Sequence, residues 1–258
     1  VPFHMWTPDV YEGAPTPVTA FFAMAPKVAA MTLMIRLVMV SFAPLTQDWQ
    51  QIVVFLSIAS MVLAAFAAIG QQSIKRLIAY SSIGHVGFAL VGLSSGTQVG
   101  VEGVAIYMAI YVGMTVALFA CILSLRTETG YVETIADLAG ASRTRPVVAG
   151  IMAIVMFSLI GLPPLAGFFA KWQVFLAAIE AHLYVLAVIG MLASAISAFY
   201  YLRAVKVMYL DEPVKEFVAV PAELNVVMVV FGFLIVTYFF TVGNPLSSFA
   251  HSAAGSLF

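Results

Sequence analysis

The sequence predicts an all-α, polytopic transmembrane helix bundle. Of its 258 residues, 63% are apolar and only 9% are charged, whereas a soluble domain carries roughly 25% charged residues. The apolar residues form runs of about 20, the length with which a helix crosses a bilayer. The net charge of −1 provides no basic footprint for nucleic acid. We therefore expect membrane lipids, and no nucleic acid, around most of the chain.

The chain divides into a short N-terminal segment and one transmembrane domain. Residues 1–16 are predicted to be the end of a preceding broken transmembrane helix and a re-entrant turn. No regular helix is expected in this segment, because it is interrupted by Pro2, Pro8, Gly13 and Pro15. We expect the chain to be the C-terminal part of a longer protein. Residues 17–258 carry seven predicted spans, at about 17–42, 50–70, 74–94, 103–125, 147–179, 183–208 and 222–243.

The span at 147–179 is predicted to be discontinuous near Gly161–Gly167. Pro163 and Pro164 have no backbone N–H donor and cannot continue a helix. Inside a bilayer, the backbone groups freed by such a break must be buried in protein or line a hydrated cavity. Lys171 follows the break, and a broken helix beside a buried cation is typical of an ion or proton path.

Lysine and arginine in the short loops predict the orientation of the chain. Basic residues lie in or beside alternate loops: Lys75, Arg76, Arg126, Arg143, Arg145, Arg203, Lys206 and Lys215. The loops near 43–49, 95–102 and 180–182 contain none. We therefore expect the basic loops to face the cytoplasm or, in a mitochondrion, the matrix. The polar link at 127–146 is expected to form a surface helix ending near Gly140.

Three titratable residues on three spans are predicted to meet near the bilayer midplane. Lys27 lies ten residues into the first span, or roughly 15 Å at 1.5 Å per residue, about half the thickness of the hydrocarbon core. His85 lies at a similar depth in the third span, and Lys171 follows the helix break. Burial disfavours the charged form of lysine, and histidine titrates near neutral pH. The three side chains could therefore pass a proton laterally.

Structural roles for these residues stay open. Lys27 could cap a carbonyl, Lys171 could hold the broken helix through freed carbonyls, and His85 could be a packing residue. Asp9 and Glu12 could bind a cation, although salt bridges around the turn are favoured. The sequence contains no Gly-rich phosphate loop, metal-ligand cluster or nucleophile–base pair. Its single cysteine supplies no haem or iron–sulfur ligand pattern.

Three segments resemble the antiporter-like subunits of respiratory complex I, the NADH:quinone oxidoreductase. These segments are Pro2–Val18, Ile74–His85 and Gly161–Lys171. The resemblance implies a fourteen-helix subunit made of two inverted five-helix repeats plus flanking helices, of which this chain would hold the end of helix seven and helices eight to fourteen. It also implies that three residues form the catalytic proton relay, with the last as the terminal donor to the outer side: Lys27, His85 and Lys171.

The function implied by the resemblance is proton translocation in the membrane arm, with no redox centre in this chain. NADH, FMN, iron–sulfur clusters and quinone are then expected in partner subunits, and the partners include sister antiporter-like subunits. The implied location is the bacterial inner membrane, with the mitochondrial inner membrane as the alternative. Two other functions stay open. One is a subunit of a multisubunit Na⁺/H⁺ antiporter, which the Asp9–Gly13 segment disfavours. The other is a scaffold whose lysines only hold broken helices.

Overall fold

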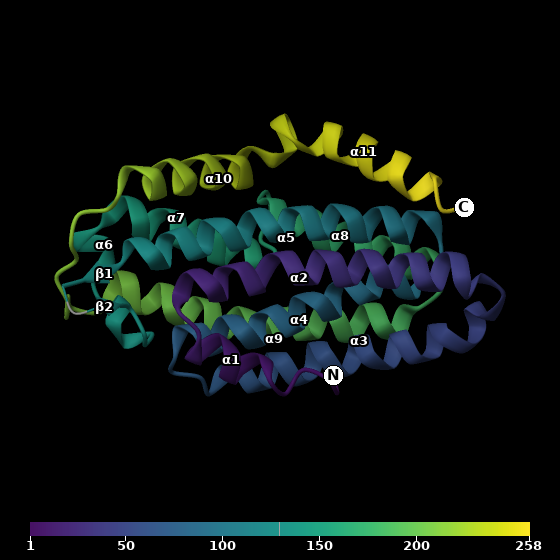
Figure 1. Ribbon diagram of the computed structural model, residues 1–258, viewed down its shortest axis with the longest axis horizontal. Helices are drawn as coiled ribbons and strands as arrows, with labels where there is room; N and C mark the ends of the chain where they lie inside the picture. The colour runs from purple at the N-terminus through teal and green to yellow at the C-terminus, as the bar shows by residue number, and fades with distance from the viewer. Residues whose placement is uncertain (129) are drawn as a thin grey trace.

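Long helices that run along one common axis make up the structure, a computed structural model that describes residues 1–128 and 130–258 (Figure 1). Within those residues the only strands are the short antiparallel pair β1 and β2. The predicted all-α fold is thereby confirmed. In chain order the elements are α1 (Thr7–Gly13), α2 (Thr16–Arg36), a π-helical turn (Leu37–Ser41), a 3₁₀ turn (Ala43–Leu45), α3 (Thr46–Ile69), α4 (Ile74–Ser94), α5 (Gln98–Ser124), β1 (Arg126–Thr127), β2 (Gly130–Tyr131), a 3₁₀ turn (Ala136–Leu138), α6 (Ala141–Thr144), α7 (Pro146–Ile160), α8 (Ala166–Glu180), α9 (Tyr184–Leu210), α10 (Ala222–Thr241) and α11 (Gly243–Gly255).

Six helical segments of the described chain are long and apolar enough to cross a membrane. They are Thr16–Ser41, Ala43–Ile69, Ile74–Ser94, Gln98–Ser124, Tyr184–Leu210 and Ala222–Thr241. The predicted discontinuous helix is confirmed, because α7 ends at Ile160 and α8 begins only at Ala166, with the prolines between them. Each half has 15 residues, so neither crosses a bilayer alone. The assignment of residues 1–16 to a longer broken helix stays a prediction.

Helix α4 is the central helix of the bundle. In its membrane-spanning window 89% of the residues are buried, against 22–39% in α2, α3, α9 and α10. Close packing on α3 contributes to this burial, since a Cβ added at Gly87 would lie 2.7 Å from the Met61 Cγ. The Ser57 hydroxyl of α3 also donates to the Gly87 carbonyl at 2.8 Å. Small residues at such contacts let membrane helices approach closely, and His85 lies beside this contact.

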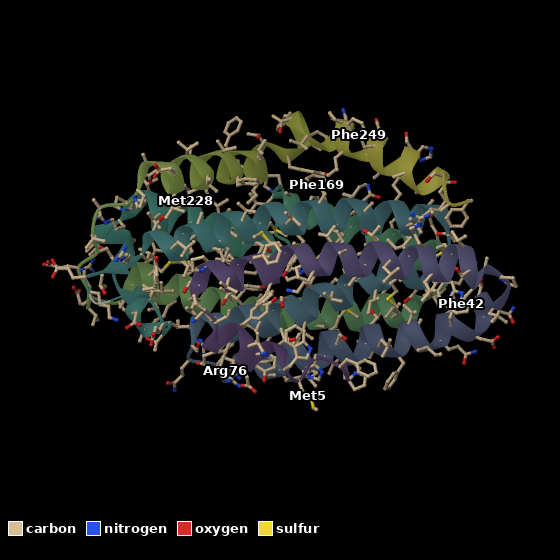
Figure 2. All side chains as sticks on the ribbon, in the orientation of Figure 1. Met5, Phe42, Arg76, Phe169, Met228 and Phe249 are labelled. Atoms are coloured by element: carbon tan, nitrogen blue, oxygen red, sulfur yellow. The ribbon has the colours of Figure 1, made fainter. Side chains whose placement is uncertain are left out.

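Large apolar side chains project outward along the whole bundle (Figure 2). Phe55 on α3, Phe233 on α10 and Phe249 on α11 are 60–74% exposed. Helices α10 and α11 lie end to end along one side, at the top of Figure 1. The outer surface is therefore suited to lipid tails or to the helices of partner chains.

The expectation that residues 1–16 contain no regular helix is wrong, because α1 occupies Thr7–Gly13. Pro8 lies in its first turn, where the missing N–H would have had no helical partner. The Thr19 hydroxyl of α2 donates to the Tyr11 carbonyl of α1 at 3.0 Å. This contact fixes α1 against the start of α2 and places Tyr11 inside the bundle.

The expectation of a surface helix at 127–146 is also wrong. The described part of this link forms the β1–β2 pair, a 3₁₀ turn and the four-residue α6, at the left end of Figure 1. The Asp137 carboxylate accepts the Thr134 N–H at 2.9 Å and the Thr134 hydroxyl accepts the Asp137 N–H at 3.2 Å, a reciprocal pair that caps the start of the 3₁₀ turn. Gly140 has a left-handed φ of 64°, and a Cβ there would lie 2.4 Å from the Pro213 nitrogen. Residue 129 lies outside the described residues.

Candidate functional site

The three titratable residues selected from the sequence lie inside the bundle on three different helices. Lys27 lies on α2 and is half-buried, whereas His85 on α4 and Lys171 on α8 are 4% and 6% exposed. Tyrosine and serine hydroxyls contact all three side chains. The structure thus contains a cluster of polar groups within an otherwise apolar bundle.

Lys27 lies beside a defect in the backbone of α2. Pro26 has no N–H, so the Phe22 carbonyl four residues earlier lacks its helical partner. The Tyr11 hydroxyl of α1 donates to this carbonyl at 3.1 Å. The Lys27 Nζ in turn donates to the Tyr11 hydroxyl at 2.8 Å and to the Tyr111 hydroxyl of α5 at 3.2 Å. The proline therefore positions a tyrosine, and the tyrosine positions the lysine.

A cavity next to Lys27 opens on one face of the bundle. Its volume is about 450 Å³, and its polar lining includes His4, Ser60 and Ser82. The Lys27 ammonium also lies 5.2 and 5.5 Å from the ring centroids of Tyr11 and Tyr111, within reach of a cation–π interaction. Water can thus reach Lys27 from this face, while two tyrosine rings stabilise its charge.

Both ring nitrogens of His85 contact tyrosine hydroxyls. Nδ1 lies 2.7 Å from the Tyr107 hydroxyl of α5, and Nε2 lies 3.2 Å from the Tyr201 hydroxyl of α9. The Tyr201 hydroxyl is also hydrogen-bonded to the Ser81 hydroxyl. A neutral imidazole has one donor and one acceptor nitrogen, so one tyrosine donates to His85 while the other accepts from it. His85 therefore links α5 to α9 through a group that can hold a proton on either side.

Lys171 holds together the two halves of the broken helix. Gly161 ends α7 with a left-handed φ of 94°, and the last carbonyls of a helix lack helical partners. The Lys171 Nζ donates to one of them, that of Ile160, at 2.8 Å and to the Ser194 hydroxyl of α9 at 2.6 Å. The ammonium also lies 4.4 Å from the Phe88 ring centroid.

Gly167 fixes the start of α8 against α7. Its N–H donates to the Ser158 hydroxyl at 2.9 Å, and a Cβ at this position would lie only 1.8 Å from the Ser158 carbonyl oxygen. A cavity of about 410 Å³ between α8 and α9 borders Lys171 and Ser194. The break is therefore tightly packed on one side and open on the other.

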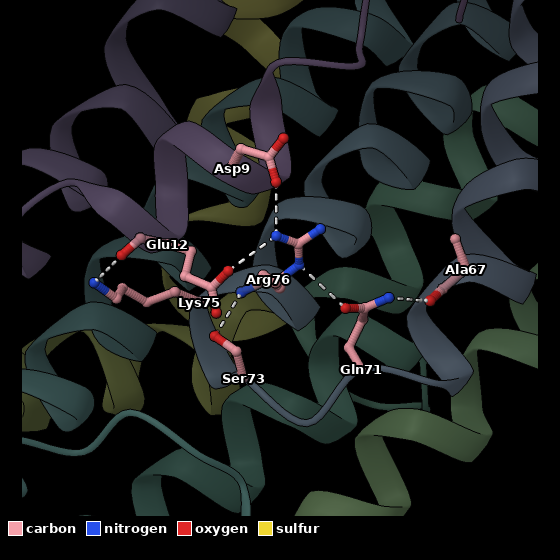
Figure 3. A network of polar contacts seen from close by, with 7 residues as sticks. All are labelled: Asp9, Glu12, Ala67, Gln71, Ser73, Lys75 and Arg76. Carbon is pink, nitrogen blue, oxygen red and sulfur yellow. Dashed lines mark hydrogen bonds and ion pairs between the residues drawn. The ribbon is translucent and has the colours of Figure 1, made fainter.

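A polar network at the basic end of the bundle holds α1 in place (Figure 3). Arg76 forms salt bridges with Asp9 at 2.7 Å and Glu12 at 2.9 Å. Lys75 donates to the backbone carbonyls of Glu12 and Ala14. The salt bridges favoured for Asp9 and Glu12 are thus present. Because α1 carries Tyr11, this network indirectly positions the partner of Lys27.

Sequence reasoning selected the titratable residues but missed three of their partners, Tyr11, Tyr201 and Ser194. A tyrosine or serine within an apolar span carries no charge, so hydropathy does not distinguish it from its neighbours. One signal was present for Tyr201 and Ser194, since they are seven residues apart in α9 and therefore share a helical face. For Tyr11 the signal was Pro26, which frees a carbonyl that some donor must satisfy.

A family model described as "NADH:quinone oxidoreductase/Mrp antiporter, TM" matches residues 1–197 of the chain. The chain is a member of this family of antiporter-like membrane proteins. With its six candidate spans and its bacterial relatives, it is a multi-pass protein of the bacterial inner membrane.

Within that family, the chain is similar to subunit N of NADH-quinone oxidoreductase. It is 59% identical to subunit N 1 of Rhizobium meliloti (strain 1021) and 60% identical to subunit N of Parvibaculum lavamentivorans. The matches cover 100% of this chain but 54% and 53% of the two relatives, so the chain spans about half their length.

Two solved structures resemble the chain. A chain of respiratory complex I from Thermus thermophilus with bound aureothin has a TM-score of 0.80 and 33% identity, over 95% of this chain and 54% of that one. A chain of the Mrp complex from Dietzia sp. has a TM-score of 0.88 over 100% of this chain and 56% of that one, at 21% identity. The second likeness shows the fold alone.

Proposed function

We propose that this chain belongs to a proton-translocating membrane-arm subunit of a respiratory NADH:quinone oxidoreductase, and that Lys27, His85 and Lys171 carry the proton. One observation supports the relay most directly: His85 contacts a tyrosine hydroxyl through each ring nitrogen. A histidine that only packs needs no group that can exchange protons at either ring nitrogen. A proton carrier needs one such group at each nitrogen, one to supply the proton and one to receive it. The identity of 59–60% with subunit N supports assignment to this enzyme.

The first transfer runs from Lys27 to His85 along α5. The Lys27 Nζ contacts the Tyr111 hydroxyl at 3.2 Å, and the Tyr107 hydroxyl contacts the His85 Nδ1 at 2.7 Å. Tyr107 and Tyr111 are four residues apart and lie on one face of α5. Each hydroxyl accepts one proton and releases another, with water proposed to carry the proton from Tyr111 to Tyr107, so both tyrosines end unchanged. His85 takes up a proton at Nδ1 and releases one from Nε2 towards Tyr201.

Changes in neighbouring charge suffice to drive this movement. Moving one proton against 100 mV costs about 2.3 kcal/mol. A unit charge about 7 Å away, at an effective dielectric constant near 20, changes the energy of a second charge by about 2.4 kcal/mol. The arrival of one charge near Lys27 or Lys171 therefore matches the cost of one transfer. Coupling to electron transfer in other subunits needs only such an electrostatic signal.

The redox groups, NADH, FMN, iron–sulfur clusters and quinone, are proposed to bind in partner subunits. Iron–sulfur clusters need several cysteine ligands, and the single cysteine of this chain, Cys121, is buried in α5. Among residues 1–128 and 130–258, no three His, Cys, Asp or Glu side chains come together as a metal site. Sister antiporter-like subunits are the proposed neighbours in the membrane.

The test uses the full-length protein in its native membrane complex. We expect His85→Leu to abolish NADH-driven proton pumping in a complex that still assembles. His182→Asn is the control, because His182 lies in the loop before α9 with a left-handed φ of 59° that asparagine tolerates. Normal pumping in His85→Leu would exclude the relay.

A sodium/proton antiporter subunit is the second candidate, because the description of the matching family model names the Mrp antiporter beside the oxidoreductase. The same membranes distinguish the two functions when NADH is omitted and a sodium gradient is applied. Proton movement driven by sodium alone, and lost in His85→Leu, would identify the antiporter. Unchanged pumping in the double variant Lys27→Met, Lys171→Met would instead identify a scaffold.

A further inference from the structure

The proposed relay has no direct connection between His85 and Lys171. Phe88 follows His85 by one turn of α4, is 4% exposed, and has its ring centroid 6.1 Å from that of His85. The Lys171 ammonium lies 4.4 Å from the centroid of the same ring. A phenyl ring neither donates nor accepts a proton, so the side chain that His85 and Lys171 both contact on α4 cannot pass a proton between them.

Helix α9 contacts both residues at once. Its Tyr201 hydroxyl lies 3.2 Å from the His85 Nε2, and its Ser194 hydroxyl accepts from the Lys171 Nζ at 2.6 Å. The two residues are seven positions apart, which is two helical turns or about 10 Å along the axis at 1.5 Å per residue. Ser197 lies on the same face between them, is 5% exposed, and donates to the Ser194 carbonyl at 2.7 Å.

We infer that α9 carries the proton from His85 to Lys171, with Tyr201 receiving it and Ser194 delivering it, and with water near Ser197 bridging the hydroxyls. The inference rests on the proposed function. Because α9 begins near the loop without lysine or arginine and ends near Arg203 and Lys206, a step from Tyr201 to Ser194 moves the proton towards the outer side. Lateral transfer and outward transfer are then one event.

Each transfer along this route is balanced. The His85 Nε2–H passes its proton to the Tyr201 oxygen while the Tyr201 hydroxyl releases its own proton to the bridging water. The Ser194 hydroxyl, which donates to the Ile160 carbonyl in the structure, then turns to the neutral Lys171 amine, gives it a proton and takes one from that water. Tyr201 and Ser194 end unchanged, His85 has lost one proton, and Lys171 has become an ammonium.

The test measures NADH:quinone turnover and NADH-driven pumping for Tyr201→Phe, Ser194→Ala and Ser194→Thr in the assembled complex. Loss of one proton-transferring hydroxyl is expected to slow turnover and pumping together, about tenfold or more, in Tyr201→Phe and Ser194→Ala. Ser194→Thr keeps the hydroxyl, and its extra methyl fits the cavity of about 410 Å³ beside Ser194. We therefore expect Thr to retain the activity that Ala loses. Because the Ser194 hydroxyl also donates to the Ile160 carbonyl at 3.1 Å, the unfolding temperature of the complex is recorded for both variants. Loss of activity in Ser194→Ala at an unchanged unfolding temperature supports the route, whereas loss that follows a lower unfolding temperature would assign Ser194 a structural role.

Two matched controls are available. Tyr238→Phe removes a hydroxyl from a buried tyrosine of α10 whose ring packs on Phe169. Ser94→Ala removes a buried hydroxyl that donates to the Leu90 carbonyl of its own helix. Both lie outside the proposed route and should keep wild-type pumping. If Tyr201→Phe fails to assemble, the Ser194 pair decides alone.

The results also separate this inference from the proposed function. Normal pumping in Tyr201→Phe and Ser194→Ala, together with loss in His85→Leu, would exclude the α9 route and leave the relay in place. Equal loss in Ser194→Ala and Ser194→Thr would show that Ser194 acts through packing. Normal pumping in His85→Leu as well would overturn the proposed function itself.

Discussion

Lys27 and Lys171 both lie beside a helix carbonyl that has lost its helical partner, but the two carbonyls are satisfied differently. At Pro26 the free carbonyl belongs to Phe22, and the Tyr11 hydroxyl donates to it. At the α7–α8 break the free carbonyl belongs to Ile160, and the Lys171 ammonium and the Ser194 hydroxyl both donate to it, at 2.8 and 3.1 Å. Lys171 therefore has a share in satisfying a free carbonyl, whereas Lys27 has none at the Phe22 carbonyl.

Loss of either lysine should stop proton transfer, because both belong to the proposed relay. Loss of Lys171 should also lower the stability of the fold, because Lys171 joins the two halves of the broken helix. Variants at Lys27 should then report on proton transfer alone. Variants around Lys171 should report on transfer and stability at once.

The largest effect is expected for Gly167→Ala, which disrupts the packing of α8 on α7 at the helix break that Lys171 stabilises. The added Cβ would lie 1.8 Å from the Ser158 carbonyl oxygen, and backbone atoms on both sides must move. Overpacking of this kind costs about 1–3 kcal/mol or more, so the complex should unfold at a clearly lower temperature and lose pumping. Gly70→Ala, with no atom within 4 Å of its added Cβ, is the control for thermal unfolding. Equal midpoints for the two variants would show that the junction is not rigid.

The next largest effect is the stability difference between Lys171→Met and Lys27→Met. Both variants remove one ammonium from the bundle, half-buried at Lys27 and buried at Lys171, so the cost of burying a charge changes in the same direction in each. Only Lys171→Met removes a charged donor from a free backbone carbonyl, a hydrogen bond worth about 1.5–3 kcal/mol. Thermal unfolding of the purified complex should give the lower midpoint for Lys171→Met, whereas the reverse order would contradict the comparison.

Tyr11→Phe leaves Lys27, like Lys171, beside a free carbonyl that no tyrosine hydroxyl satisfies. Without the Tyr11 hydroxyl, the Phe22 carbonyl loses its donor and Lys27 keeps only the Tyr111 hydroxyl and the Ala23 carbonyl. We expect a stability loss of about 1 kcal/mol and a partial loss of pumping, measured against Tyr131→Phe in β2. Wild-type pumping in Tyr11→Phe would mean that Tyr11 does not position Lys27.

The smallest effect is expected at Asp137, far from both lysines in the basic loop. Burial acts to raise the pKa of Asp137, but the Lys215 ammonium at 2.8 Å and two backbone N–H groups outweigh it and hold the pKa below its ordinary value. The pair therefore adds stability above the unfolded pKa of about 3.9 and loses it as the pH falls through the lower folded value.

We expect Asp137→Asn to be less stable than wild type at pH 7, by about 1 kcal/mol or less, and equal to it in strong acid. Unfolding curves recorded across that pH range check this. Pumping at neutral pH should not change. A stability difference that persisted in acid would assign the loss to packing instead of charge.

The features that hydropathy and charge determine were predictable from the sequence. Apolar runs predicted the long helices, Pro163 and Pro164 predicted the break, and charges within apolar runs predicted Lys27 and Lys171 as candidates. All three are local properties, because they depend on residues close together in the chain.

The features that depend on tertiary contacts were not predictable. Tyr201 meets His85 across 116 positions of sequence, and no local pattern encodes such a pairing. The predicted helix at 127–146 is wrong because the turn that Thr134 and Asp137 cap extends only to Leu138. Gly140, with its left-handed φ, follows and packs on a distant proline. Pro8 misled in the opposite direction, because a proline in the first turn is compatible with a helix.

NADH-driven proton pumping, recorded together with NADH:quinone turnover in membranes carrying Lys27→Met in the full-length protein, tests the central claim most directly. The Phe22 carbonyl beside Lys27 keeps its donor, the Tyr11 hydroxyl, and the Ala23 carbonyl that Lys27 contacts lies one turn earlier in the same helix. The complex should therefore assemble and unfold at the wild-type temperature. Turnover and pumping should both be lost in this intact complex. Wild-type turnover with wild-type pumping would exclude Lys27 from proton transfer and make it a structural lysine.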